Sequence, residues 1–324
     1  MHFEQRWKEL LPRSEVRQVF KKMWNLAKLD IKLTPEGPFL IKAQEGLDPT
    51  RPEMEFVRLT TPFGESLYVP GSSLKGVIRS ASEALLRSLG QEVCDPTNTA
   101  PDSEDGICPQ QKRNRGKKRD EKLPYEDHCN ICKTFGSTEL AGRMSFRDLL
   151  PWRVEGDPSQ RMEAVAAINR YLSVRPGIAL DRRKGSVAHG PFEMEVLSGG
   201  DFYGEVVARN YALWQLGLLF FVFERLDEGT LRLGFGKSRG LGRVRVTVER
   251  MLIEQFGTLA QERDGRYMIQ GAPQPGEEEE ITLALPEEIE PRDTGLSLRF
   301  EFTGEELKGL KEQLIDHFKR RYQR

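Results

Sequence analysis

The most regular hydrophobic pattern in the chain lies between residues 67 and 90. Pro70 and Gly71 interrupt a strand-like stretch, and Gly90 is a typical residue just beyond a helix end. Between them, apolar residues recur close to helical spacing: Leu74, Val77, Ile78, Ala81, Leu85 and Leu89. This spacing predicts a helix with one buried face.

The first turn of this helix carries groups that suit a phosphate. Ser72 and Ser73 can cap it, and Lys75 and Arg79 follow within two turns. Unpaired backbone amides at a helix N-terminus favour an anion. The alternative is an ordinary capped helix with solvated basic residues, which is the more common arrangement.

Patterns elsewhere predict a mixed α+β protein. Residues 45–66 lack a clear period and predict a loop, and 91–134 have little apolar content. Helices are expected at 1–29, 162–171, 211–226 and 305–322. Strands are expected at 30–33, 39–44, 144–146, 148–150, 231–233, 243–248 and 296–302, with a hairpin of 192–197 with 201–208.

Composition narrows the class of protein. Of 324 residues, 38% are hydrophobic and 31% charged, and the formal net charge is −1. No apolar run is long enough to span a membrane and no signal peptide opens the chain, so we expect a cytoplasmic protein without a membrane partner. Basic residues are nevertheless segregated, and a local basic surface matters more for RNA than total charge.

The cysteines indicate a metal site. Cys129 and Cys132 form a close C-x2-C pair, and Cys94 and Cys108 lie upstream in the same apolar-poor segment. Four thiolates can hold one structural Zn²⁺ whose binding energy orders the segment locally. His128 could replace one cysteine, and four unrelated free thiols are the alternative.

A second candidate site is the glycine-rich stretch at 234–243. Four glycines alternate there with basic and hydroxyl groups, namely Lys237, Ser238, Arg239 and Arg243. Glycines allow a backbone to approach a ligand closely, and the basic side chains can neutralise phosphates. The spacing does not fit a P-loop or a dinucleotide fold, and a plain glycine-rich hairpin is the alternative.

A basic stretch at 175–195 predicts an extended hairpin. It carries Arg175, Arg182, Arg183 and Lys184, with apolar residues alternating between them. A surface hairpin with solvated charges is the alternative.

Four ordered motifs resemble the RAMP superfamily of CRISPR-associated RNA-binding proteins, above all the backbone subunits of type III effector complexes. They are PGSSLKG at 70–76, FGSTELAGRMSF at 135–146, the basic stretch from 175 to 202, and LGFGKSRGLGRVRV at 233–246. The resemblance implies a ferredoxin-like (RRM-type) core at 30–254, with a zinc-knuckle insertion at 91–134 and a thumb hairpin at 175–195. Residues 1–29 and 255–324 would be N- and C-terminal extensions.

This resemblance also implies partners and a reaction. Such subunits coat the guide RNA (crRNA), bind complementary target RNA, and assemble with further copies of themselves and other subunits. Many cleave the target with Mg²⁺ or Mn²⁺ and an acidic residue of the loop between the first strand and the PGSSLKG helix. Asp48 is our first candidate here. Glu55 and Glu53 are further candidates, because the usual family spacing counted back from the helix falls closer to Glu55 than to Asp48.

Other functions fit less well. An inactive scaffold that relies on a partner nuclease remains open. A guide-processing endoribonuclease would need a histidine near the first strand or helix, but only His2 precedes residue 128. A zinc hydrolase would need an open metal position with an HxE sequence near it, and the cysteine-containing segment 91–134 has no HxE sequence.

Overall fold

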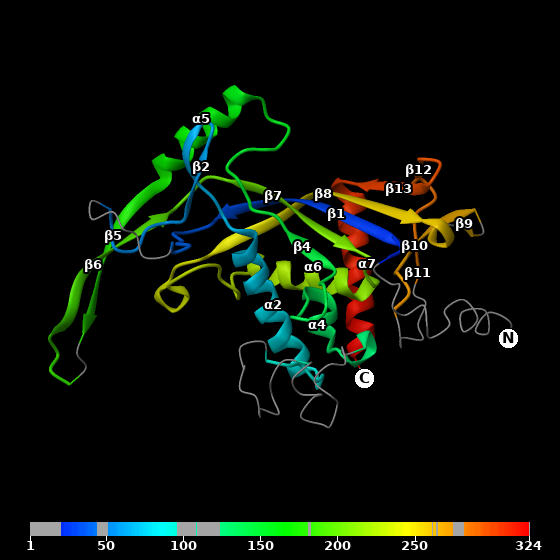
Figure 1. The fold of residues 1–324 in the computed structure, drawn as a ribbon, viewed down its shortest axis with the longest axis horizontal. Coiled ribbons are helices and arrows are strands. Elements are labelled where there is room, and N and C mark those ends of the chain that lie inside the picture. The colour runs from blue at the N-terminus through cyan, green and yellow to red at the C-terminus, as the bar shows by residue number, and fades with distance from the viewer. Residues whose placement is uncertain are drawn as a thin grey trace.

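The computed structural model describes residues 21–43, 51–95, 108, 124–180, 183–260, 262–263, 265–274 and 282–323. Its centre is a six-stranded antiparallel sheet of order β12-β13-β8-β1-β7-β4 (Figure 1). The strands are β1 (Asn25–Pro35), β4 (Met144–Phe146), β7 (Phe202–Arg209), β8 (Val244–Phe256), β12 (Arg292–Asp293) and β13 (Ser297–Phe302).

Two helices connect the inner strands in the order β1-α2-β4-β7-α6-β8. These are α2 (Gly71–Ser88) and α6 (Leu213–Asp227). Both follow expected helical segments, and Gly90 takes the left-handed backbone (φ 74°) predicted beyond the end of α2. Helix α6 is apolar on nearly every side because it lies between the sheet and other helices.

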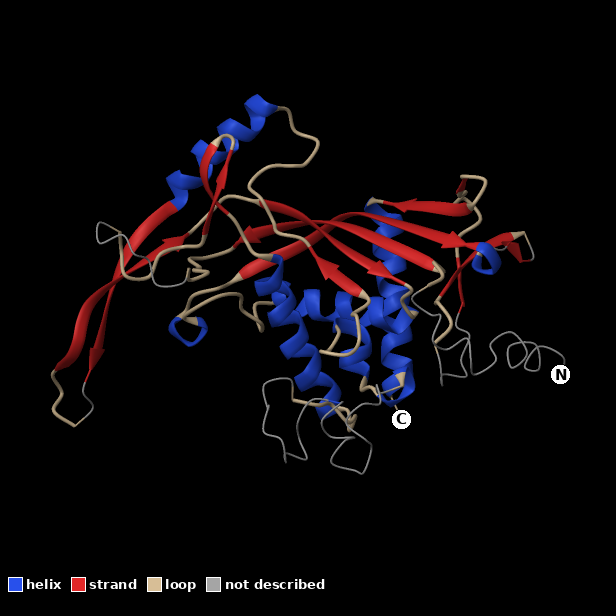
Figure 2. Ribbon diagram, viewed as in Figure 1, coloured by secondary structure: helices blue, strands red, loops and turns tan. Residues whose placement is uncertain are grey.

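One face of the sheet carries most of the helices (Figure 2). Helix α7 (Gly304–Tyr322) packs on α6, and α4 (Asn130–Phe135) packs on α2. The core lies between these helices and the sheet, and Leu29, Phe220 and Phe300 are fully or almost fully buried in it. The main sheet and its helices therefore share one hydrophobic core.

A long hairpin projects from this body (Figure 1). It consists of β5 (Leu172–Leu180) and β6 (Val187–Leu197), which pair with each other. On the sheet face opposite the other helices lie α5 (Pro158–Ile168) and the small hairpin β2 (Arg58–Thr61) and β3 (Gly64–Leu67) (Figure 2). The remaining elements are β9 (Glu262–Arg263), β10 (Arg266–Gln270), β11 (Thr282–Ala284) and short 3₁₀ turns at Tyr125–Asp127, Asn169–Tyr171, Lys237–Arg239 and Gly257–Leu259.

The helix expected at 1–29 is wrong for residues 25–29. Strand β1 begins at Asn25, so the expected helical segment 1–29 does not reach these residues, and its first 20 residues lie outside the described ones. Burial alternates along β1 because successive side chains point to opposite faces of the sheet. Strands β7 and β8 pair with β1, one on either side. The hydrogen bonds that β1 forms with both neighbouring strands outweigh the weak helical preference of Asn25–Leu29.

Two further expectations are corrected. The hairpin of 192–197 with 201–208 does not form, because β6 pairs with β5 while β7 pairs with β1 and β4. Within the expected loop 45–66, residues from Arg58 onward form the β2–β3 hairpin.

At the C-terminal end, β13 pairs with β8, so residues beyond 254 complete the central sheet. Among the described residues, no helix is both long and apolar enough to cross a membrane.

Candidate nucleic-acid interface and metal centre

The glycine-rich loop is held against the segment after β1. The amide of Phe235 donates to the carbonyl of Leu40 at 2.7 Å, and Gly242 donates to Pro38 at 3.0 Å. Gly234 has φ 86°, and a methyl group there would overlap the Leu40 carbonyl oxygen. Only glycine fits this position, so Gly234 allows the loop backbone to lie directly against Leu40.

The tip of this loop presents basic groups to solvent. Lys237, Ser238 and Arg239 form an exposed 3₁₀ turn between two left-handed glycines, Gly236 and Gly240. The Arg239 guanidinium lies 5.9 Å from the ring centre of Phe235. Arg243 is different, because its Nε donates to Glu36 at 3.0 Å and Arg245 pairs with the same carboxylate. The tip therefore offers cations at an ordered position, which suits phosphate contacts.

The start of α2 is less open than expected. Neither Ser72 nor Ser73 caps the helix; Pro70 is its N-cap residue, and the first amide, that of Gly71, donates to Asp148 Oδ1 at 2.8 Å. A carboxylate thus occupies part of the amide-rich end where a phosphate was expected. Ser72 is exposed and Ser73 and Lys75 are half-buried.

Lys75 keeps a basic group at this end. Burial, together with the charge of Arg79, lowers the pKa of its ammonium group. Arg79 points into the fold, where it donates to Glu83 at 2.9 Å and to the carbonyl of Gly136 at 2.9 Å. Arg79 therefore ties α2 to the residue that ends α4.

The projecting hairpin carries the second basic group. Arg175, Arg183 and Lys184 are exposed, and Arg182 lies outside the described residues. Strand β5 also exposes Val174 at 50% and Ile178 at 55% on one face. The hairpin thus presents both basic and apolar side chains to solvent.

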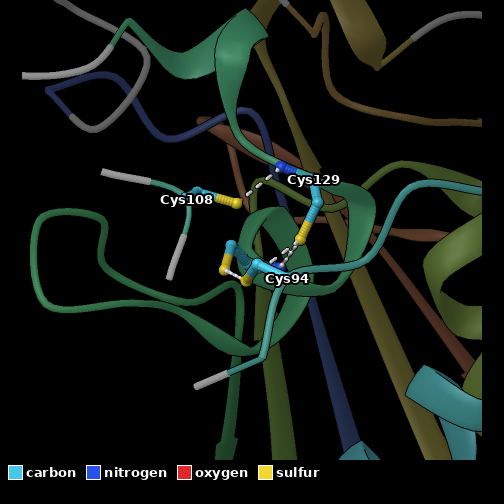
Figure 3. A group of neighbouring side chains, drawn as sticks. Cys94, Cys108 and Cys129 are labelled. Carbon is cyan, nitrogen blue, oxygen red and sulfur yellow. Dashed lines mark hydrogen bonds between the residues drawn. The ribbon is translucent and has the colours of Figure 1, made fainter. Parts of the chain in front are cut away.

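The four cysteines come together as predicted (Figure 3). Their sulfur atoms all lie within 4.8 Å of one another. Cys94 follows α2, while Cys129 is the N-cap of α4 and Cys132 lies in its first turn. Four sulfur donors at this mutual spacing match the ligand set of a closed tetrahedral zinc site. His128 is buried next to Cys129 but is not a member of this group.

The surroundings of the cluster favour negative charge on Cys129, whereas hydrogen bonds to Cys129 raise the pKa of Cys108. The amide of Cys129 donates to the Cys108 sulfur at 3.3 Å, and that of Cys132 donates to the Cys129 sulfur at 3.5 Å. Hydrogen bonds from the thiols of Cys108, Cys132 and Cys94 hold the pKa of Cys129 below its usual value. A thiolate among thiols is the form from which a metal site assembles.

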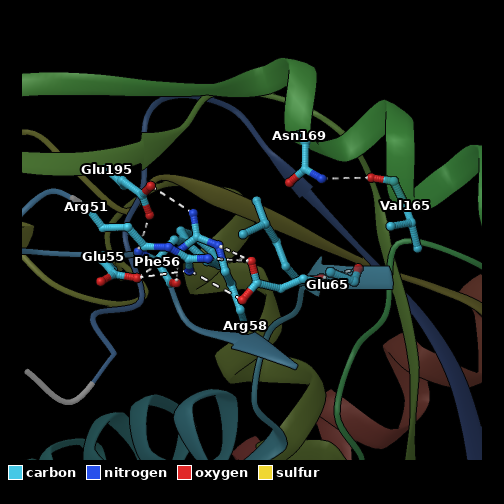
Figure 4. Close-up of polar contacts among 10 residues, drawn as sticks. Arg51, Glu55, Phe56, Arg58, Glu65, Val165, Asn169 and Glu195 are labelled. Atoms are coloured by element: carbon cyan, nitrogen blue, oxygen red, sulfur yellow. Dashed lines mark hydrogen bonds and ion pairs between the residues drawn. The ribbon is translucent and has the colours of Figure 1, made fainter. Parts of the chain in front are cut away.

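The acidic segment before α2 is only partly described. Asp48 lies outside the described residues, and Glu53 is exposed. Glu55 lies 3.3 Å from Arg51 and 3.4 Å from Arg58 (Figure 4). Its charge is already compensated by two guanidinium groups, which weakens its case as a metal ligand.

Sequence reasoning missed two carboxylates at these sites. Asp148 occupies the start of α2, and Glu195 receives hydrogen bonds from residues near Glu55. Neither belongs to a spaced motif, and their roles follow from contacts across 77 and 137 or more residues. Alternation along the strand places Glu195 on the face opposite Met194 and Val196, so the sequence gives no signal that it is buried.

Comparison with known proteins identifies the family. A search of curated proteins returned no match. The sequence model of the RAMP superfamily matches residues 32–245, which is more than half of the chain and runs from β1 through the glycine-rich loop into β8. The chain therefore belongs to the RAMP superfamily of CRISPR-associated RNA-binding proteins.

Proposed function

We propose that this chain is the guide-RNA-coating backbone subunit of a type III or type III-derived CRISPR effector complex. The observation that carries this proposal is the ordered loop tip at Lys237–Arg239. It presents exposed cations on a backbone that is pinned to Leu40 and Pro38. Such a loop recognises a phosphate backbone without reading bases.

The order of elements supports this assignment. The connection β1-α2-β4-β7-α6-β8, with the strands arranged β8-β1-β7-β4, supports the ferredoxin-like (RRM-type) core that we propose. RRM-type sheets are a common RNA-binding scaffold. Zinc fits the four-thiolate site, where Cys94, Cys108, Cys129 and Cys132 would hold it and the metal would supply local folding energy.

The β5–β6 hairpin is the proposed thumb. Its exposed apolar face would insert between bases of the guide–target duplex, and Arg175, Arg183 and Lys184 would contact the backbone. Unstacking costs a few kcal/mol per step and is offset by such contacts. The partners would be crRNA, target RNA, further copies of this chain and other effector subunits.

Target cleavage at regular intervals is the proposed activity. Asp48 remains the first candidate for holding Mg²⁺ or Mn²⁺, with Glu55 and Glu53 as alternatives. The cation would stabilise charge that develops on the scissile phosphate. A catalytically inactive scaffold is the competing function, supported by the ion pairs that already engage Glu55.

Native mass spectrometry of the purified complex tests the proposal. We expect several copies of this chain on one guide RNA, with one zinc for each copy. A monomer without RNA, purified from cells that express a guide and the other subunits, would contradict the backbone role.

A further inference from the structure

The projecting hairpin has a second attachment besides its own base. The amide of Met54 donates to the Glu193 carbonyl at 3.1 Å, and the amide of Glu195 donates to the Met54 carbonyl at 2.9 Å. Met54 therefore lies parallel to β6 beside Met194. Segment 51–58, which contains Glu53 and Glu55, is in this way joined by its backbone to the hairpin.

Glu195 reinforces the joint with its side chain (Figure 4). The residue is 6% exposed, and both carboxylate oxygens are used. Oε2 accepts from the amide of Phe56 at 2.8 Å, and Oε1 accepts from Arg58 Nη2 at 2.7 Å. Charge-assisted bonds of this length at a buried site are among the stronger polar contacts in proteins.

Arg58 extends the joint to the next hairpin. Besides Glu195, it donates to the carbonyl of Phe56 at 2.9 Å and lies 3.6 Å from Glu65 on β3. Arg51 lies 3.0 Å from the same Glu65. Arg58 would thus keep partners if Glu195 were lost, so removing Glu195 loosens one joint without stranding a buried cation.

We propose that Glu195 is a positioning residue that fixes segment 51–58 to strand β6, so that this segment and the β5–β6 hairpin keep one separation along bound RNA. The inference rests on the proposed function, because it matters only if the hairpin displaces a target nucleotide and a catalytic acid within or just before segment 51–58 acts on that target. The joint would then set the register of the cut relative to the displaced nucleotide, since catalysis tolerates little misplacement of reacting groups.

The chain offers a matched control for this test. Glu193 is on the same strand, two residues away and on the same side, but its side chain is exposed. Glu193→Ala and Glu195→Ala therefore remove the same charge, but only the second removes the contacts to Phe56 and Arg58. Glu195→Gln retains an acceptor for the Phe56 amide and serves if the alanine variant does not fold.

Hydrogen–deuterium exchange of the assembled complex reads the joint directly. In Glu195→Ala, we expect amides of residues 51–58 to exchange about tenfold faster or more, as loss of a buried charged hydrogen bond implies. Glu195→Gln should lie between this variant and the wild type, and Glu193→Ala should match the wild type. Unchanged exchange at 51–58 in Glu195→Ala and Glu195→Gln overturns the proposal.

Cut positions on a labelled target RNA read the consequence. Glu195→Ala should bind guide and target as the wild type does, yet spread its cuts over neighbouring linkages or cut more slowly. Glu193→Ala should cut at the same linkages as the wild type. Faster exchange with unaltered cuts would also overturn the positioning role. If the wild-type complex never cuts, the cleavage proposal fails, whereas the exchange result still decides whether Glu195 forms the joint.

Discussion

The amide of Phe235 donates to the carbonyl oxygen of Leu40 at 2.7 Å, and this bond seats the glycine-rich loop on the segment that follows β1. The two residues are far apart in sequence, and the close approach of their backbones depends on Gly234. The basic tip of the loop thus has a fixed position relative to the sheet. This gives the molecule an ordered cationic site instead of a flexible basic tail.

Glycine replacement separates packing from backbone strain in this loop. Gly234→Ala should lower the free energy of unfolding by about 1–3 kcal/mol from overlap with Leu40, in addition to the strain of its positive φ. Gly240 has a similar φ of 87° but open space around it, so Gly240→Ala should cost only about 1–2 kcal/mol. Chemical denaturation of both variants measures the difference. Equal losses would mean that contact with Leu40 contributes nothing.

The loop tip should bind RNA without regard to sequence. Replacing Lys237 and Arg239 with Ala should weaken binding to every guide sequence alike and reduce the salt slope by about 0.7 for each lost phosphate contact. Titrations of single-stranded RNA at several salt concentrations measure both effects. Lys308→Ala is the control, because Lys308 is an exposed cation on α7 that pairs with Glu305. Loss confined to particular sequences would contradict backbone contact.

The thiol cluster should bind about one Zn²⁺ per chain. Cys132→Ser should abolish zinc in elemental analysis and expose residues near α4 to proteolysis, since the metal orders this segment. His128→Ala should retain zinc because His128 lies outside the group of four sulfurs. Zinc lost from His128→Ala but kept in Cys132→Ser would show that histidine is a ligand in place of that cysteine.

Local patterns predicted some features and could not predict others. The apolar period of α2 and the cysteine spacing are short-range signals, and both appear in the structure. The hairpin at 175–195 was also predicted, and β5 pairs with β6 there. The expected pairing of 192–197 with 201–208, by contrast, was wrong, because Gly199 and Gly200 resemble a hairpin turn. In the structure both glycines pack against Tyr171, where a side chain would overlap its ring or the neighbouring Ile168. The partner of Arg58 was likewise hidden, since no local rule connects it to Glu195.

The final prediction concerns target cleavage and compares Asp48 with Glu55. Asp48→Ala should lower the rate of metal-dependent cutting by about 10²–10³-fold, the usual cost of losing a group that stabilises developing charge. Target binding should remain unchanged. The measurement is single-turnover cleavage of a complementary target by the assembled complex in Mg²⁺ or Mn²⁺.

Glu55→Ala should behave differently because Glu55 pairs with Arg51 and Arg58. Its loss should lower the free energy of unfolding by about 1–3 kcal/mol while changing the cutting rate far less than Asp48→Ala. A large rate loss in a stably folded Glu55→Ala, with Asp48→Ala active, would transfer the catalytic role to Glu55. If the wild-type complex binds target but cuts it only when a separate nuclease is added, the subunit is a scaffold. Segment 51–58 would then serve only to support the β5–β6 hairpin.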